Sequence, residues 1–159
     1  MSGKPVPGRM TTDGTEEVVV FLIGMRINSW RAVRSWLPMI GAMTRMIREL
    51  AQERERGMLG YRVLPGLRNV TVLQYWASKD KLLAYAGEQS GAHRPAWAAF
   101  NRRARAGHGR VGIWHETFVV PAGAYESIYA NMPEFGLGAA LGMVPVGRRG
   151  ERAADRLAA

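Results

Sequence analysis

The hydrophobic positions change period along the chain, and the order of those changes predicts the fold. Residues 17–27 (EVVVFLIGMRI) form a nearly continuous β-branched and apolar run, which is typical of a strand covered on both faces. Asn28 or Ser29 can then cap a long helix, because apolar residues recur after them at three-to-four spacing. Pro38 lies inside that pattern and predicts a kink, or a short first helix that ends near Trp36.

The next two apolar runs predict a hairpin. Residues 58–64 and 69–77 are both strand-like, and the dipeptide Pro65-Gly66 between them is a turn signal. The short connection favours antiparallel pairing. Ser78 then offers a cap for another helix.

The histidine-containing half of the chain predicts a helix followed by a strand. Residues 92–105 have helical spacing with arginines at the end, and residues 111–120 alternate with a period of two. In that alternation His115 shares a face with β-branched apolar residues, whereas Glu116 points the opposite way. We therefore expect His115 to be buried or to line a cavity.

The resulting order, β-α-β-β-α-β, predicts an α+β, ferredoxin-like fold in which helices cover one face of a four-stranded antiparallel sheet. Because the strands are apolar on both faces, we expect a second copy to pack on the open face and form a homodimer. The predicted organisation is a flexible arm (1–15), one main domain (16–130), a Gly-rich C-terminal segment (131–147) and a basic tail (148–159).

Composition narrows the class of protein. A chain of 159 residues with 47% hydrophobic content can form one packed domain, and it contains no apolar run of membrane-spanning length. The absence of cysteine and of a secretory signal favours a cytoplasmic protein. The net charge of +9 invites a nucleic-acid partner, but the arginines are spread out and no nucleic-acid-binding motif is present, so we expect a solvated basic surface instead.

Common catalytic and cofactor motifs are missing. The histidines and carboxylates lack metal-site spacing, so we expect no metal. Neither a dinucleotide-binding GxGxxG sequence nor a nucleophile elbow is present.

Several blocks together carry a resemblance to a known family: L-G-Y-R, Q-Y-W, A-H-R-P-A-W-x-x-F-N-R-R, G-I-W-H-E-T and P-A-G-A-Y-E-x-I-Y-x-N-M-P-x-F-G-L-G. Over residues 17–140 the chain resembles short monooxygenase-like proteins that are similar to the monooxygenase of fumagillin biosynthesis. They belong to the dimeric α/β-barrel superfamily. The resemblance implies that fold for residues 16–130 and a role in secondary metabolism. It implies no single reaction, because fold does not fix function.

A more distant resemblance links residues 114–131 to the haem-dependent aldoxime dehydratases. The histidine of their strand H-E motif is an acid-base group, and it matches His115. His93 matches a histidine near their haem ligand, whereas Ala96 stands at the ligand position itself. The cofactor is therefore left unknown: none is favoured, and haem with His93 as its ligand stays open as an alternative.

The function that we expect is a monooxygenase-like oxidoreductase acting on a small hydrophobic molecule, aromatic or polyketide-like. His115 would remove a proton from the substrate, and Asn28 or Arg26 would steady the resulting anion. The alternatives are a haem enzyme of the aldoxime-dehydratase type and a non-catalytic module that binds a hydrophobic ligand. We expect the cavity between sheet and helices to be lined by Trp36, Tyr75, Trp76, Trp97 and His115.

Overall fold

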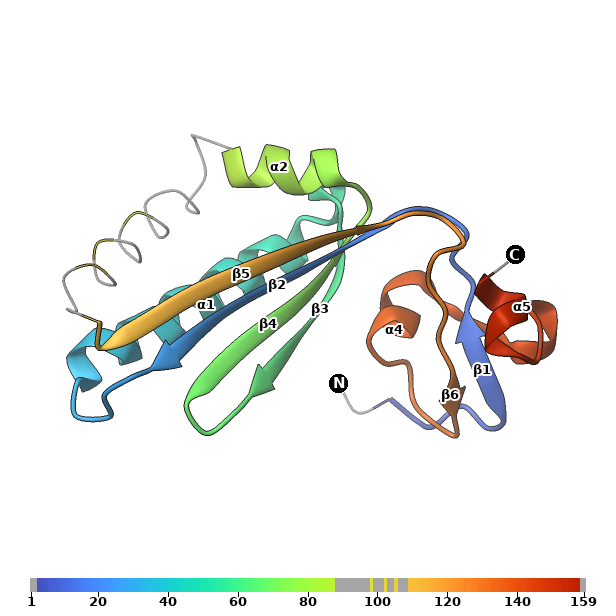
Figure 1. Cartoon of the computed structure of the whole chain (residues 1–159), viewed down its shortest axis with the longest axis horizontal. Coiled ribbons are helices and arrows are strands. Elements are labelled where there is room, and N and C mark those ends of the chain that lie inside the picture. The colour runs from blue at the N-terminus through green and yellow to red at the C-terminus, as the bar shows by residue number, and fades with distance from the viewer. Residues whose placement is uncertain (1–2, 88–97, 99–101, 103–104, 106–108, 158–159) are drawn as a thin grey trace.

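The structure, a computed structural model, describes residues 3–87, 98, 102, 105 and 109–157 (Figure 1). Its main body is one antiparallel sheet with the strand order β3-β4-β2-β5. This order and the connections between the strands confirm the α+β, ferredoxin-like fold. The elements of the main body are β2 (Val18–Ile27), α1 (Val33–Gln52), the 3-10 turn η1 (Arg54–Arg56), β3 (Met58–Pro65), β4 (Asn69–Trp76), α2 (Lys79–Gly87) and β5 (Val111–Val120).

The core lies between the sheet and α1. Strand β2 is central, with β4 on one side and β5 on the other, and its odd-numbered side chains point toward the helix. Helix α1 buries one stripe at helical spacing against them. The buried members of this cluster are Ile23, Met25, Ile27, Met39, Met43, Ile47, Val72 and Val111.

The start of α1 differs from the expectation. The helix begins at Val33, and its N-cap position is Ala32, which has no side-chain acceptor; Asn28 lies further upstream and donates its amide to the carbonyl of Gly109 at 2.8 Å. The prediction that Asn28 or Ser29 caps the helix is therefore wrong. The predicted end near Trp36 is wrong too, since α1 continues through Pro38 as far as Gln52.

The hairpin and the second cap are confirmed. Strands β3 and β4 pair antiparallel, and the amide of Gly66 donates to the carbonyl of Asn69 at 2.7 Å to close the turn. The hydroxyl of Ser78 accepts a hydrogen bond from the amide of Lys81 at 3.2 Å at the start of α2.

The two ends of the described chain form a second, smaller unit, which we call the terminal module. Its sheet has the order β6-β1-β7, so the N-terminal strand lies in the middle. The prediction of a flexible arm over residues 1–15 is therefore wrong at β1, where Thr11 and Thr12 are buried. The module consists of β1 (Arg9–Thr12), β6 (Tyr129–Ala130), α4 (Leu137–Leu141), β7 (Met143–Pro145), the 3-10 turn η2 (Val146–Arg148) and α5 (Ala153–Leu157).

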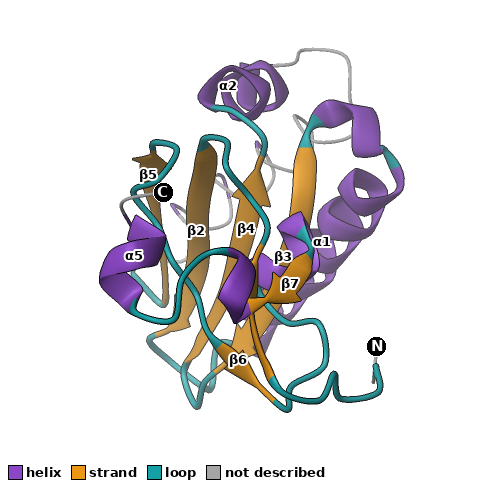
Figure 2. Ribbon diagram, turned by 90° about the vertical axis from the view of Figure 1, so that its right-hand side faces the viewer, coloured by secondary structure: helices purple, strands orange, loops and turns teal. Residues whose placement is uncertain are grey.

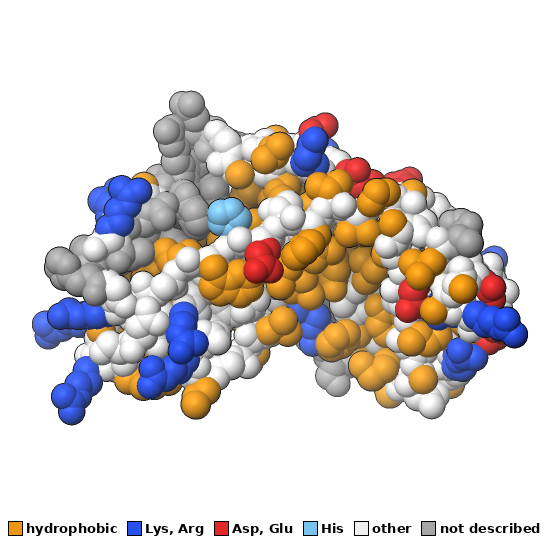
Figure 3. Space-filling model, viewed as in Figure 1, with side chains coloured by type: hydrophobic (Ala, Val, Ile, Leu, Met, Phe, Trp, Pro, Cys, Tyr) orange, Lys and Arg blue, Asp and Glu red, His pale blue; other side chains and the backbone are white. Residues whose placement is uncertain are grey.

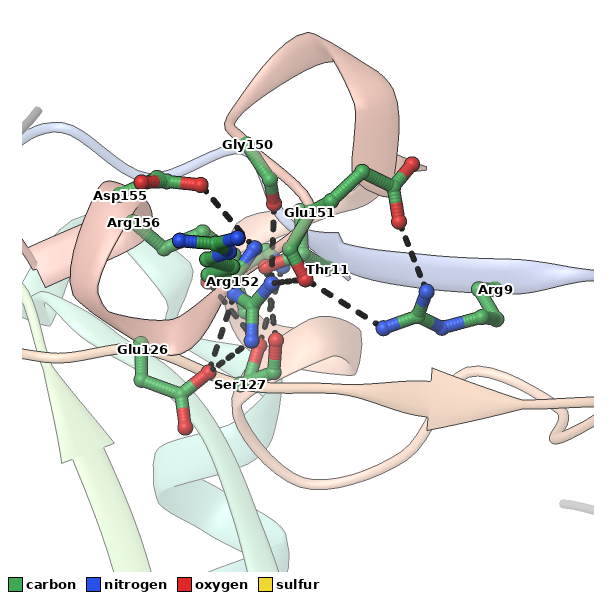
Figure 4. Close-up of polar contacts among 10 residues, drawn as sticks. Arg9, Thr11, Glu126, Ser127, Gly150, Glu151, Arg152, Asp155 and Arg156 are labelled. Atoms are coloured by element: carbon green, nitrogen blue, oxygen red, sulfur yellow. Dashed lines mark hydrogen bonds and ion pairs between the residues drawn. The ribbon is translucent and has the colours of Figure 1, made fainter.

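A buried arginine holds the end of the chain in the terminal module (Figure 4). Arg156 is only 4% exposed and donates to one carboxylate oxygen of Glu126 at 2.8 and 3.1 Å. It also donates to the carbonyls of Gly150 and Glu151. The prediction of a basic tail over residues 148–159 is therefore wrong for this part, because one of its arginines is an internal structural group.

The terminal module packs on the helix-free face of the sheet near β3. Figure 2 is turned so that the module stands in front of the sheet, with α1 beyond it. A Cβ placed on Gly60 would lie 3.4 Å from Ala140 of α4, and the guanidinium of Arg62 lies 3.6 Å from the centre of the Phe135 ring. Within the described ranges, no helix is long and apolar enough to cross a membrane.

Candidate functional site

A cavity of about 240 Å³ lies between the sheet and the helices α1 and α2. Its floor is made by the helix-facing side chains of the three strands β4, β2 and β5. Its walls come from the two helices. The described residues that line it are Phe21, Ile23, Met43, Met46, Ile47, Leu50, Gln74, Trp76, Leu82, Leu83, Tyr85, Ala86, His115 and Thr117.

Strand register fixes the spacing of the polar groups on the floor. Phe21 of β2 pairs with Gln74 on one side and with Thr117 on the other. Ile23, one step along the same face, pairs with His115 of β5. Because neighbouring strands lie about 4.8 Å apart, the backbones of Gln74 and Thr117 are separated by roughly 10 Å. Two polar rims therefore flank an apolar centre.

We expected His115 either to be buried or to line a cavity, and it lines the cavity. Its ring centre lies 5.9 Å from that of Phe21, with the two planes tilted by 42°. Its side chain is nevertheless exposed, so the alternative prediction of burial is wrong. The reason is that β5 is the edge strand of the described sheet, so that β2 supports His115 from one side only.

The end of the floor opposite His115 is buried, and its side chains are held by contacts with one another. Trp76 is fully buried, and its ring centre lies 5.4 Å from that of Tyr85 on α2. The indole N–H of Trp76 donates to Oε1 of Gln74 at 2.9 Å. The guanidinium of Arg56 lies 5.9 Å from the centre of the Tyr85 ring, at the outer side of this cluster. The prediction that Trp76 faces the cavity thus agrees with its position.

The described lining of the cavity is mostly apolar. None of the described lining side chains is an aspartate, glutamate, lysine or arginine. An apolar wall of this kind is typical of sites for hydrophobic ligands, and His115 is the one histidine among the described lining residues. No group of three histidine, cysteine, aspartate or glutamate side chains that could hold a metal is found in the described part of the chain.

Two predicted lining residues lie elsewhere. Tyr75 follows the alternation of β4 to the helix-free face, where its hydroxyl would be 3.3 Å from a Cβ on Gly136. Trp36 packs at the far end of the core, donates to the carbonyl of Trp30 at 3.3 Å, and does not line the cavity. The prediction that these two side chains share the cavity with His115 is therefore wrong.

The two predicted anion-stabilising residues also lie outside the cavity. Arg26 is an exposed residue of β2, and the alternation of the strand turns its side chain to the helix-free face. Asn28 follows the end of β2, and its amide is engaged with the carbonyl of Gly109. Neither prediction fits this geometry. His93 and Trp97 lie outside the described residues.

Tyr75 instead belongs to a separate cluster under the terminal module. Burial raises the pKa of the Tyr75 phenol, the nearby Tyr129 adds to this rise, and Arg62 opposes it. Tyr129 accepts a hydrogen bond from the amide of Gly138 at 2.9 Å. This cluster therefore joins the sheet to the terminal module.

Gln74, Phe21 and Thr117 were not predicted from the sequence. Gln74 carried a usable signal, because it is an amide within the helix-facing row of β4 formed by Val72, Gln74 and Trp76. Phe21 gave no signal, since a phenylalanine in an apolar strand is typical of any core. The lining residues from α1 and α2 depend on how the helices pack.

Comparisons with known proteins agree with the resemblance noted in the sequence. The sequence model of the Monooxygenase af470-like family matches residues 18–137. Monooxygenase af470 of Aspergillus fumigatus is 30% identical over 139 residues, covering 79% of this chain and 48% of that protein. The chain thus spans about half the length of the curated relative that it matches.

Solved structures with some likeness include oxygenases. SnoaB from Streptomyces nogalater, a cofactor-independent oxygenase, has a TM-score of 0.41 and 14% identity over 65% of this chain and 91% of its own. A putative antibiotic biosynthesis monooxygenase from Chloroflexus aurantiacus has a TM-score of 0.32 and 11% identity over 76% of this chain and 99% of its own. Likeness at this level carries no argument about the site. The match of the family model over residues 18–137 shows that the chain belongs to the Monooxygenase af470-like family.

Proposed function

We propose that this chain is a monooxygenase-like oxidoreductase that acts on a small hydrophobic, aromatic molecule in the cavity between the sheet and the helices. The single observation that carries the proposal is the position of His115 on the wall of a cavity whose described lining is otherwise mostly apolar and contains no aspartate, glutamate, lysine or arginine. Membership of the Monooxygenase af470-like family supplies the reaction class.

The cavity volume limits the size of the substrate. A cavity of roughly 150 Å³ lined by apolar side chains can hold benzene, whereas sites for drug-sized ligands enclose about 300–1,000 Å³. A volume of about 240 Å³ lies between these two cases. A molecule with two fused rings is therefore the best match in size.

His115 would act as the general base. A neutral imidazole can take a proton from a phenol or an enol, which leaves an electron-rich substrate anion. The anion would reduce O₂ and form a carbon–oxygen bond, giving a hydroperoxide. Loss of water then breaks the oxygen–oxygen bond and leaves a new carbonyl, so the substrate itself supplies every electron that O₂ accepts.

We propose this chemistry without a cofactor. Haem is a poor fit for the cavity, because 240 Å³ is below the range of sites for drug-sized ligands and one histidine, His115, is found among the described lining residues. The alternative ligand His93 can be tested directly. Protein purified from haem-supplemented cells is expected to lack a stoichiometric Soret band; a full band that His93→Ala removes would favour the haem alternative.

We also propose a homodimer in which a second copy covers the part of the helix-free face that the terminal module leaves open. Phe118 of β5 is 51% exposed there, and Val20 and Leu22 of the neighbouring strand are half-buried. Figure 3 shows hydrophobic side chains gathered over the end of β5 and toward the terminal module, above a hollow. Such a patch is typical of an interface. A stable monomer in light scattering at micromolar concentration would contradict it.

The test of the function uses 1-naphthol and an oxygen electrode. Oxidation of 1-naphthol to 1,4-naphthoquinone consumes one O₂ and releases one water, so both product and oxygen can be followed. His115→Ala is expected to lower turnover by roughly 100-fold or more. His115→Gln is expected to be nearly as inactive, because an amide cannot accept the proton. Glu116→Gln, on the adjacent residue with the opposite orientation, is the control and should keep its activity.

The outcomes separate the candidate functions. Loss of turnover with an unchanged melting temperature supports the proposed role of His115. Full activity in both folded His115 variants would refute it. Binding of 1-naphthol without oxygen consumption in the wild type would favour the alternative of a non-catalytic hydrophobic-ligand-binding module.

A further inference from the structure

Gln74 is a polar side chain at a position that the fold alone would make apolar. It lies on β4 and is only 6% exposed, and on its own face it is flanked by Val72 and Trp76, which are both fully buried. It also lines the cavity next to Phe21. A buried amide is destabilising unless its donors and acceptors are satisfied. The question is therefore which groups satisfy Gln74.

Trp76 fixes the orientation of the Gln74 amide. Its indole Nε1 lies 2.9 Å from Oε1 of Gln74. Because an indole N–H can only donate, the atom facing it must be the amide oxygen. The amide nitrogen of Gln74 is therefore turned away from Trp76, with two hydrogens to donate.

No hydrogen-bond partner for that nitrogen is found in the described part of the chain. Thr117, the polar residue in the same row of the floor, stands two strands away on β5. The indole N–H of Trp76 is bonded to the amide oxygen of Gln74 and is no partner for its nitrogen. Among the described surroundings, the two N–H groups of Gln74 can therefore find an acceptor only in the cavity.

We propose that Nε2 of Gln74 is a specificity-determining donor that binds an oxygen acceptor of the molecule in this cavity. The inference rests on the proposed function and narrows the substrate to aromatic molecules that carry a carbonyl or phenolic oxygen at the edge remote from His115. A hydrocarbon of the same shape leaves the amide unsatisfied, and such a site discriminates against it.

The floor of the cavity sets the geometry of this recognition. Gln74 and Thr117 flank Phe21, and His115 stands one step further along β5. The strand spacing places the two rims roughly 10 Å apart, so a flat molecule lying over the Phe21 ring would reach both of them. Gln74 would hold one oxygen at the buried rim, and the phenolic or enolic hydroxyl that is deprotonated would face His115 at the exposed rim.

Binding of two matched bicyclic probes tests the proposal without any need for turnover. 1-Tetralone and tetralin share one skeleton, and only the former carries a carbonyl oxygen. Isothermal titration calorimetry gives the ratio of their dissociation constants in each variant. The ratio, rather than either constant, removes the difference in hydrophobicity between the probes.

Gln74→Met removes the donors and nearly preserves the volume. The preference for 1-tetralone over tetralin is expected to fall by about fivefold to tenfold, the loss typical of one net hydrogen bond. Thr71→Val, on the same strand but on the helix-free face, does not touch the cavity; it is the control and should leave the ratio unchanged. Because Gln74→Met strands the indole N–H, the double variant Gln74→Met/Trp76→Phe is included, and it should show the same loss.

An unchanged ratio in a folded Gln74→Met protein would overturn the inference while leaving the proposed function in place. If the wild type bound neither probe, the cavity would not be the ligand site, and the proposed function would fail together with the inference.

Discussion

The two faces of the four-stranded sheet are built from the same strands and differ in what they pack against. On the helix-facing side, Gln74 and His115 stand at the two rims of a cavity without charged described lining residues. On the other side, Tyr75 and Arg62 lie under the terminal module, and Arg62 stacks on Phe135. The polar groups of one face therefore line a cavity, whereas those of the other face join two parts of the chain.

This difference shows that adjacent residues of one strand can belong to different parts of the molecule: one lines the cavity and the next packs against the terminal module. Tyr75 lies between Gln74 and Trp76 in the chain but points to the opposite face, because successive side chains of a strand alternate. Polar residues on one strand cannot therefore be assigned to a site as a group. Each belongs to the layer that covers its own face.

The largest effect on stability is expected from removing a large buried side chain of the cavity-facing core. Trp76→Ala removes a fully buried ring that contacts Tyr85 and should lower the free energy of unfolding by about 3–5 kcal/mol. Trp114→Ala, on the half-buried opposite face, is the matched control and should lower it by less. Urea denaturation compares the two variants; an equal loss would mean that the two faces are covered equally well.

The next effect concerns the ion pair that holds Arg156 in the terminal module. Arg156→Met leaves Glu126 without its charged partner, and removal of one member of a buried pair is destabilising by about 3–5 kcal/mol. Because Glu126 is partly exposed, we expect about 3 kcal/mol, the lower end of that range. Thermal unfolding measures the loss. Arg9→Met removes an exposed ion pair with Glu151 and should change stability by less than about 1 kcal/mol.

A glycine on β2 tests the packing of the helix-free face. A Cβ on Gly24 would lie 2.6 Å from the indole nitrogen of Trp114, so Gly24→Ala should lower the free energy of unfolding by about 1–3 kcal/mol. Gly41→Ala on the exposed side of α1 meets no atom within 4 Å and should be stabilising by roughly 0.5–1 kcal/mol. Equal signs for the two variants in chemical denaturation would refute this account.

The smallest effect is a pH dependence above neutrality. Burial raises the pKa of the Tyr75 phenol in the folded protein above its unfolded value of about 10. The neutral phenol therefore contributes stability that is fully present below pH 10 and is lost as the pH rises through the folded pKa. Tyr75→Phe should flatten the decline of the melting temperature above pH 10. A decline as steep as that of the wild type would show that other groups cause it.

The amino-acid sequence by itself determined most of the main body. The period of two in residues 111–120 placed His115 on the face that lines the cavity, and the Pro65-Gly66 turn between two apolar runs determined the β3–β4 hairpin. Ser78 was identified as a cap from its position before a helical pattern. These features depend on neighbours in the chain, so local periodicity is enough to predict them.

Other features depended on contacts between residues far apart in the chain, and only the tertiary structure decided them. β1 pairs with strands more than 115 residues away, and the side chain of Arg156 is buried against Glu126. Neither segment has a hydrophobic period of its own, so the sequence predicted a flexible arm and a basic tail. The neighbours of Gln74 and the exposure of His115 could not be predicted either, because they too depend on contacts between distant residues. A periodic pattern shows which face a side chain occupies, but the layer that covers this face is set by the packing of the whole chain.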